Sequence, residues 1–233
     1  MNSKGTGLTL ALGIVAGFIG YILFQITIGI DTKSDDIATI LTNSSNGGTI
    51  ISIASILIVV GLVVHAAGLW STKGTASSTA ESLGIFCIIS AIVIWIANMA
   101  TGVAMVEMGD KFVAAMAGAG AGDAAAAASA GIIGTAAGFT QAFSVGASTL
   151  GGILAGIGWL FIGIAYRTTD VKGALSFIPL GWLAIIMGLL LIVSNIIITS
   201  VVSVEVASQI SGISFILIVI WSLSRGIALI NEK

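Results

Sequence analysis

Few side chains in this sequence could do covalent or metal chemistry. The 233 residues include one cysteine, Cys87, and one histidine, His65. A lone cysteine cannot form an internal disulfide, and this pair cannot supply the three or four ligands of a protein metal centre. The two residues fall toward the same end of neighbouring apolar segments, but the pattern provides no orienting carboxylate for a nucleophile and base. The sequence therefore predicts a protein that is not an enzyme and holds no cofactor.

The other polar side chains within the apolar segments gather toward the opposite end. They are Gln25, Asn98, Thr101, Glu107, Gln141, Asn195, Glu205 and Gln209. Polar groups are costly in hydrocarbon, so such residues either form a functional site or hydrogen-bond between helices. One interpretation is a polar cavity open to the outside, with the two glutamates at its rim. The other is that the amides bridge helices in pairs while the glutamates are solvated at the ends of the spans.

His65 stands apart from this set, nearer the other end of its segment. We interpret it as a neutral imidazole bonded to a neighbouring backbone group or serine. A proton relay is the alternative, but it needs a second titrating partner at the same depth.

Glycines recur four positions apart and place two small residues on one helix face. The pairs are Gly13 and Gly17, Gly134 and Gly138, and Gly152 and Gly156. Small residues allow helices to approach closely in lipid. We expect these faces to pack helices within the chain or to mediate self-association.

The composition explains why so few side chains could act as catalysts or ligands. Hydrophobic residues make up 57% of the chain and charged residues only 8%, with a formal net charge of −2. A soluble domain carries about a quarter of its residues as charged side chains, so this chain lacks a water-facing surface of the ordinary kind. No run of like charges suits a nucleic acid, and the lipid bilayer is the partner that the composition indicates.

Six uncharged runs are long enough to cross roughly 30 Å of hydrocarbon as helices. They predict one integral membrane domain, residues 1–233, with an all-α fold and a six-helix bundle. The predicted spans are residues 7–30, 49–70, 83–106, 136–166, 176–200 and 202–224.

The cations predict the orientation of this bundle. With the N-terminus inside, six fall on the cytoplasmic side, namely Lys4, Lys73, Arg167, Lys172, Arg225 and Lys233, and two fall outside, Lys33 and Lys111. Lys and Arg near span ends are retained in the cytoplasm. The sequence therefore predicts a multi-pass protein of the cell membrane with both termini cytoplasmic.

Two outer links carry local signals. After the first span, Ser34 precedes a helical pattern that includes Ile37, Ile40 and Leu41, which predicts a short interfacial helix capped by Ser34. In the second link, the glycines of residues 118–122 predict a flexible hinge, and Asp123 is expected to cap an alanine helix that leads into the fourth span.

The first and fourth spans share a short pattern, Gly-Ile-Val-Ala-Gly at residues 13–17 and Gly-Ile-Leu-Ala-Gly at residues 152–156. This match raises the hypothesis of two inverted three-helix halves, an arrangement that transporters use.

A second pattern lies near the cytoplasmic ends of the fourth and fifth spans. Residues 158–161 read Gly-Trp-Leu-Phe, residues 166–167 read Tyr-Arg, and residues 178–182 read Ile-Pro-Leu-Gly-Trp. Together with the span layout, these residues resemble the six-helix bacterial and archaeal membrane proteins grouped as domain of unknown function 4386. The resemblance implies a six-helix fold and no catalytic residues, and the Ala/Gly-rich outer link departs from it.

These observations predict a non-catalytic scaffold or accessory subunit of a membrane complex, which associates with other membrane subunits or with itself through glycine-rich faces. A small-solute transporter or channel that uses the outer polar set is the alternative.

Overall fold

The computed structural model describes residues 2–169 and 171–232, and this part of the chain is built from helices. In chain order they are α1 (Ser3–Ile28), α2 (Ile37–Asn46), α3 (Gly48–Ser71), α4 (Thr79–Gly120), α5 (Ala124–Thr169), α6 (Leu180–Ile192), the π-helix η1 (Val193–Ile198), α7 (Thr199–Val201) and α8 (Val204–Asn231).

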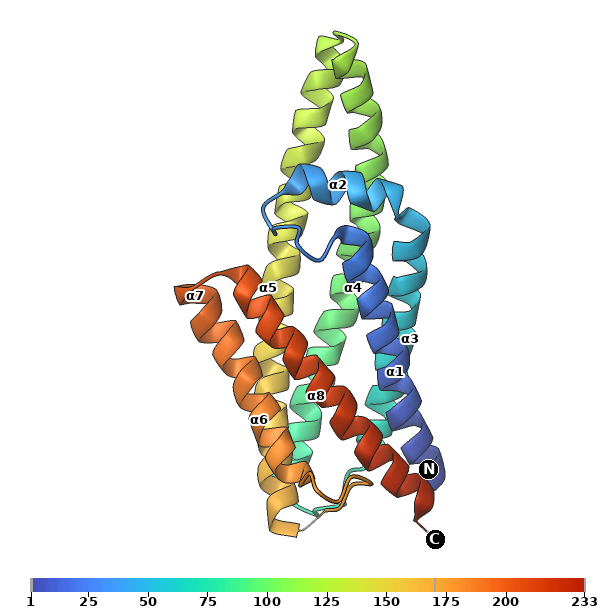
Figure 1. Cartoon of the computed structure of the whole chain (residues 1–233), viewed down its shortest axis with the longest axis vertical. Coiled ribbons are helices and arrows are strands. Elements are labelled where there is room, and N and C mark those ends of the chain that lie inside the picture. Colours follow the sequence, from blue (N-terminus) through green and yellow to red (C-terminus); the bar gives the residue numbers. More distant parts are fainter. Residues whose placement is uncertain (1, 170, 233) are drawn as a thin grey trace.

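Six of these helical stretches are long and apolar enough to cross a membrane: α1, α3, α4, α5, the continuous stretch Leu180–Val201, and α8. Each contains one of the predicted spans or overlaps most of it. The chain is therefore a multi-pass helical membrane protein. Both termini lie at the same end of the bundle (Figure 1).

The long antiparallel pair of α4 and α5 forms the centre of the fold (Figure 1). α1 packs on α3, α3 packs on α4, and α6 packs on α5. α8 crosses the bundle obliquely and contacts both α6 and α1, so it joins the two sides. We call the end that carries the termini the inner end and the opposite end the outer end.

The outer end differs from the expected flexible loop. α4 has 42 residues and α5 has 46, which correspond to about 63 Å and about 69 Å of helix. The helices continue because alanine is the best helix former and the turn needs only Ala121 to Asp123, with Gly122 at a φ of 90°. Asp123 accepts hydrogen bonds from the amides of Ala125 and Ala126 at 2.9 and 3.2 Å, which confirms it as a cap of the alanine helix.

The short helix of the first outer link is confirmed, but its predicted cap is wrong. Asp36 caps α2 by accepting a bond from the amide of Thr39 at 3.2 Å. The hydroxyl of Ser34 instead donates to the carboxylate of Glu205 at 3.0 Å, because the link passes beside the start of α8. α2 lies across α4 and α5 (Figure 1) and buries Ile40 and Leu41 against Met105 and Ala137.

The main core lies toward the inner half of the bundle. Trp159 of α5 and Trp221 of α8 pack edge to face with ring centroids 4.8 Å apart, and the ring of Tyr166 lies tilted against that of Trp221 at 5.8 Å. The indole of Trp221 donates to the carbonyl of Leu180 at 3.1 Å, so its one polar atom is paired. This core fixes α8 against both α5 and the start of α6.

Candidate functional site

Asn98 and Thr101 of the predicted polar set lie at the interface of α4 with α5. The amide of Asn98, which is 4% exposed, donates to the hydroxyl of Ser148 at 3.1 Å and more weakly to the carbonyl of Ser144 at 3.4 Å. The hydroxyl of Thr101 donates to the backbone carbonyl of Asn98 at 2.7 Å. These bonds join two helices and leave the amide buried.

Asn195 lies at a different interface, where η1 meets α8. Its amide donates to the carbonyl of Leu191 at 2.8 Å and to the hydroxyl of Ser211 at 3.3 Å. Gly152 of α5 lies directly against the same side chain, so a larger residue at this position would collide with the amide. The two asparagines thus contact adjacent turns of α5 but bond to different helices.

Aromatic side chains lie between α1, α4 and α8 close to these amides. Gln25 donates to the hydroxyl of Tyr21 on its own helix at 3.2 Å. The ring of Phe215 then lies 5.7 Å from that of Tyr21 and 5.2 Å from that of Trp95. At this position the helices meet through packed rings.

The other members of the set are spread over the outer surface. Glu107 forms an exposed ion pair with Lys111 at 2.9 Å, and Glu205 accepts the bond from Ser34 described above. Gln141 is half-buried on α5, and Gln209 is exposed on α8. The contacts of the described residues therefore divide the set among separate interfaces and do not gather it around one cavity.

Two open grooves occur at the outer end, and no member of the predicted set lines them. One, of about 510 Å³, lies between α2 and α4 and is lined in part by Thr39, Thr42, Phe112 and Met116. The other, of about 620 Å³, lies along the link that precedes α2. The first groove lies at the base of the α4–α5 hairpin.

The glycine pairs also have unequal roles. A Cβ added at Gly13 would collide with the backbone of His65 and Gly61 on α3, and one at Gly156 would lie 2.9 Å from the carbonyl of Gly188 on α6. At Gly134 no atom lies within 4 Å, and at Gly138 the nearest is 4.0 Å away. The same spacing thus serves close helix contacts in α1 and in the inner part of α5, whereas in the outer part of α5 it faces open space.

Several close approaches involve glycines that the four-residue spacing did not indicate. Matched glycines face one another between α1 and α8, α4 and α5, and α5 and α6; the pairs are Gly7 with Gly226, Gly84 with Gly158, and Gly163 with Gly181. Glycine at both sides of a crossing lets two backbones meet without an intervening side chain. The repeated segments at residues 13–17 and 152–156 both lie in such crossings, and the inverted-repeat hypothesis stays a prediction.

The inner end holds buried charged groups whose burial was not predicted from the sequence. Glu81, on the first turn of α4, is 1% exposed. Its carboxylate accepts from the amides of Gly74 and Ala76 at 2.8 and 3.1 Å and so organises the link between α3 and α4. The sequence did contain a signal, because Ser78 and Glu81 have the spacing of a capping box. In the structure Ser78 makes its half of the motif, with its hydroxyl accepting from the amide of Glu81 at 3.1 Å, while the Glu81 carboxylate bonds to the link as described.

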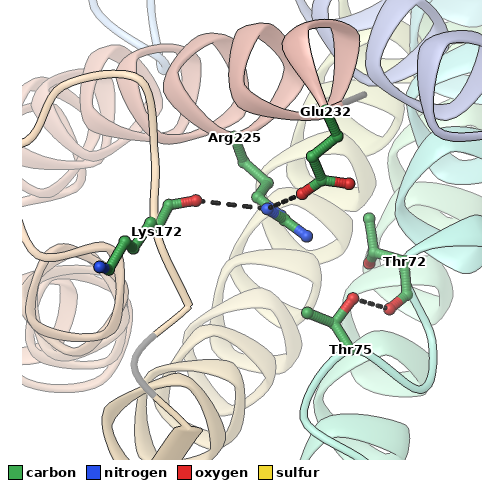
Figure 2. Close-up of polar contacts among 5 residues, drawn as sticks. All are labelled: Thr72, Thr75, Lys172, Arg225 and Glu232. Carbon is green, nitrogen blue, oxygen red and sulfur yellow. Dashed lines mark hydrogen bonds and ion pairs between the residues drawn. The ribbon is translucent and has the colours of Figure 1, made fainter.

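Arg225 is the second buried charge, with a side chain that is 7% exposed. Figure 2 shows it extending from α8 into the space between the inner links, with Thr72 and Thr75 on the far side. Its Nη1 donates to the carbonyl of Lys172 at 3.2 Å and to the carboxylate of Glu232 at 3.4 Å, while its Nε has no hydrogen-bond partner. The sequence indicated only an interfacial cation at this position.

His65 and Tyr166 are further buried polar residues at this end. The Nδ1 of His65 lies 3.1 Å from the carbonyl of Leu10, and since a carbonyl only accepts, Nδ1 carries the proton. This contact confirms the predicted bond to a backbone group, whereas the neutral state of the imidazole stays a prediction. Its Nε2 and the hydroxyl of Tyr166 are buried without a hydrogen-bond partner. Cys87 is a partly buried free thiol on α4.

Comparisons of the chain with protein-family models, with curated protein sequences and with solved structures found no significant match. The geometry is that of a multi-pass membrane protein with a tightly packed bundle and a long outer hairpin.

Proposed function

We propose that the protein is a non-catalytic accessory or scaffold subunit of a complex in the cell membrane, with both termini cytoplasmic. The observation that carries the proposal is the hairpin formed by the outer parts of α4 and α5, residues 112–132, which continues beyond α2 (Figure 1).

This hairpin is too long to remain within hydrocarbon. Asp110 of α4 accepts a bond from Ser45 of α2 at 2.6 Å, and Glu107 and Lys111 form their exposed pair at the same level. Charged and amphipathic groups of this kind mark a membrane interface. The residues from Phe112 to the turn add roughly 12 Å of helix beyond that level.

The surface of the hairpin is unsuited to water. Asp123 is its only charged residue, whereas Met116 and Ile132 are 50% and 72% exposed. Contiguous apolar surface outside the membrane commonly marks a protein interaction site. A helical surface with this single charge, with the groove between α2 and α4 at its base, best fits an apolar helix of another membrane subunit.

The interior of the bundle supports the same proposal. Asn98 and Asn195 each bond to neighbouring helices, as expected of amides that hold helices together. In the transporter alternative these amides would line a hydrated passage, and their replacement by leucine would abolish solute flux in reconstituted vesicles while the protein stays folded.

The experiment is site-specific photocrosslinking in native membranes. A photoreactive residue at Met116 or Ala127 should capture one recurrent protein, which is then identified, while the same group at Leu12 of α1, 62% exposed on a span, should capture lipid. Ala128→Lys, a change at an exposed position of the hairpin, should abolish the protein adduct without altering the abundance of the chain. Lipid adducts alone at the hairpin positions would refute the proposal.

A further inference from the structure

The inner end contains an unfilled hydrogen-bonding position at Arg225. A guanidinium is always charged and carries five N–H donors, so burial requires acceptors on each of its edges. Here the bonds to Lys172 and Glu232 both use Nη1, and the Nε–H is buried without an acceptor. An unsatisfied buried donor is strongly disfavoured, which indicates that an acceptor belongs beside Nε.

A second donor without a partner lies in the same region. The Tyr166 hydroxyl is buried and makes no well-formed hydrogen bond, although the hydroxyls of Thr72 and Thr75 lie near it. Both threonine hydroxyls donate to backbone carbonyls, and Figure 2 shows Arg225 directed toward them. The region thus presents a cation whose Nε–H lacks an acceptor and a phenol without a well-formed hydrogen bond.

Glu232 shows that the guanidinium binds an anionic oxygen. Its carboxylate reaches Nη1 at 3.4 Å, near the upper limit for a hydrogen bond, and its side chain is 51% exposed. A weak, partly solvated contact of this kind near the end of the chain is easily displaced. The other carboxylate nearby, Glu81, is already occupied by two backbone amides.

The charge of the inner end also favours an anion. Among the described residues at this end, the cations are Lys4, Lys73, Arg167, Lys172 and Arg225, and the acids are Glu81 and Glu232. Basic sites between membrane helices bind lipid head groups, and arginine binds phosphate in a bidentate manner.

We propose that Arg225 forms a binding site for the phosphate group of a lipid or of a free phosphate ion, and that Glu232 occupies part of this site until phosphate displaces it. Phosphate oxygens would accept from Nε of Arg225 and from the hydroxyl of Tyr166, the two donors that the chain itself leaves unpaired. This site is independent of the proposed hairpin interaction, which lies at the opposite end of the molecule.

The test uses the purified full chain, stripped of lipid in detergent. Phosphatidic acid is compared with diacylglycerol, which has the same acyl chains without the phosphate, and inorganic phosphate is the third probe. Native mass spectrometry counts bound lipid, and thermal unfolding measures the stabilisation by each probe. Phosphatidic acid alone raising the melting temperature identifies a lipid head group, and inorganic phosphate raising it equally identifies the free ion.

Four variants assign the binding to this site. Arg225→Lys keeps the charge but removes the planar donor edge, so it should lose most of the binding. Arg167→Gln is the matched control, because Arg167 is an exposed cation of the same end that packs on the ring of Trp182 at 4.1 Å. It should bind phosphate as the parent does. Glu232→Gln removes the competing carboxylate and should tighten binding by about two- to fivefold.

Tyr166→Phe keeps the ring in the core and removes only the hydroxyl, so it tests the site even where a variant of Arg225 does not fold. It should weaken binding while the unliganded protein remains folded. Equal binding by the parent, Tyr166→Phe and Glu232→Gln would overturn the proposal, as would the absence of any difference between phosphatidic acid and diacylglycerol. In either case the unpaired donors are satisfied by water.

Discussion

Replacement of Gly156 by alanine tests the packing of α5 against α6. The added Cβ would lie 2.7 Å from Cγ1 of Ile192 and 2.9 Å from the carbonyl oxygen of Gly188. The isoleucine side chain can rotate away, but the carbonyl belongs to the backbone of α6. The two helices must therefore move apart by several tenths of an ångström along a contact that includes the core.

Two opposing effects set the magnitude. Overpacking a close contact costs about 1–3 kcal/mol, whereas replacing glycine by alanine in a helix gains up to about 1 kcal/mol of helix propensity. Gly134→Ala is the matched control, because it makes the same change in the same helix where no atom lies within 4 Å. The propensity gain is common to both variants, so their free energies of unfolding should differ by about 1–3 kcal/mol, with Gly156→Ala the less stable.

The assay is reversible unfolding of each purified variant in mixed micelles, followed by circular dichroism and by tryptophan fluorescence. The fluorescence reports on the five tryptophans of the chain, of which Trp159 lies one turn from Gly156 in the buried core. Equal stability of the two variants would refute the reasoning, since it would show that α5 and α6 do not approach closely at Gly156.

Two further predictions concern the inner link and the orientation. Glu81→Gln should lower the free energy of unfolding by about 1–3 kcal/mol, because an amide can accept from only one side where the carboxylate accepts two backbone bonds. Glu107→Gln, which loses only an exposed pair, should change it by less than about 0.5 kcal/mol, and equal effects in thermal unfolding would contradict the buried role of Glu81. In a chain whose Cys87 is replaced by alanine, a cysteine at Lys111 should react with an impermeant maleimide in intact cells and one at Lys73 should not. The reverse pattern would invert the proposed orientation.

Features that depend on neighbouring residues along the chain were predictable from the sequence. The apolar runs predict all six membrane-crossing helices, because a span needs only length and hydropathy. Asp123 was identified as a cap because its side chain bonds to amides two and three residues later. The helix at Ile37 was likewise predicted, although the choice of Ser34 over Asp36 as its cap was wrong because Ser34 bonds to a distant helix.

The extent of helix at the outer end was harder to predict from hydropathy. Glu107 ends the apolar run but not α4, since Lys111 pairs with it one turn later and alanine sustains the helix through the following residues. Hydropathy locates the part of a helix that crosses the membrane, whereas helix propensity and capping determine where the helix ends.

Only the tertiary structure decided which polar and small residues act together. Gly134 and Gly156 occur in the same four-residue spacing, yet one faces open space and the other faces the backbone of α6. Asn98 donates a hydrogen bond to Ser148 of another helix. Arg225 is buried because the link at Lys172 and the segment at Glu232 fold over it. A sequence lists the donors and small faces of each helix, but the crossing of two helices determines which atoms they meet, and that depends on the packing of the whole bundle.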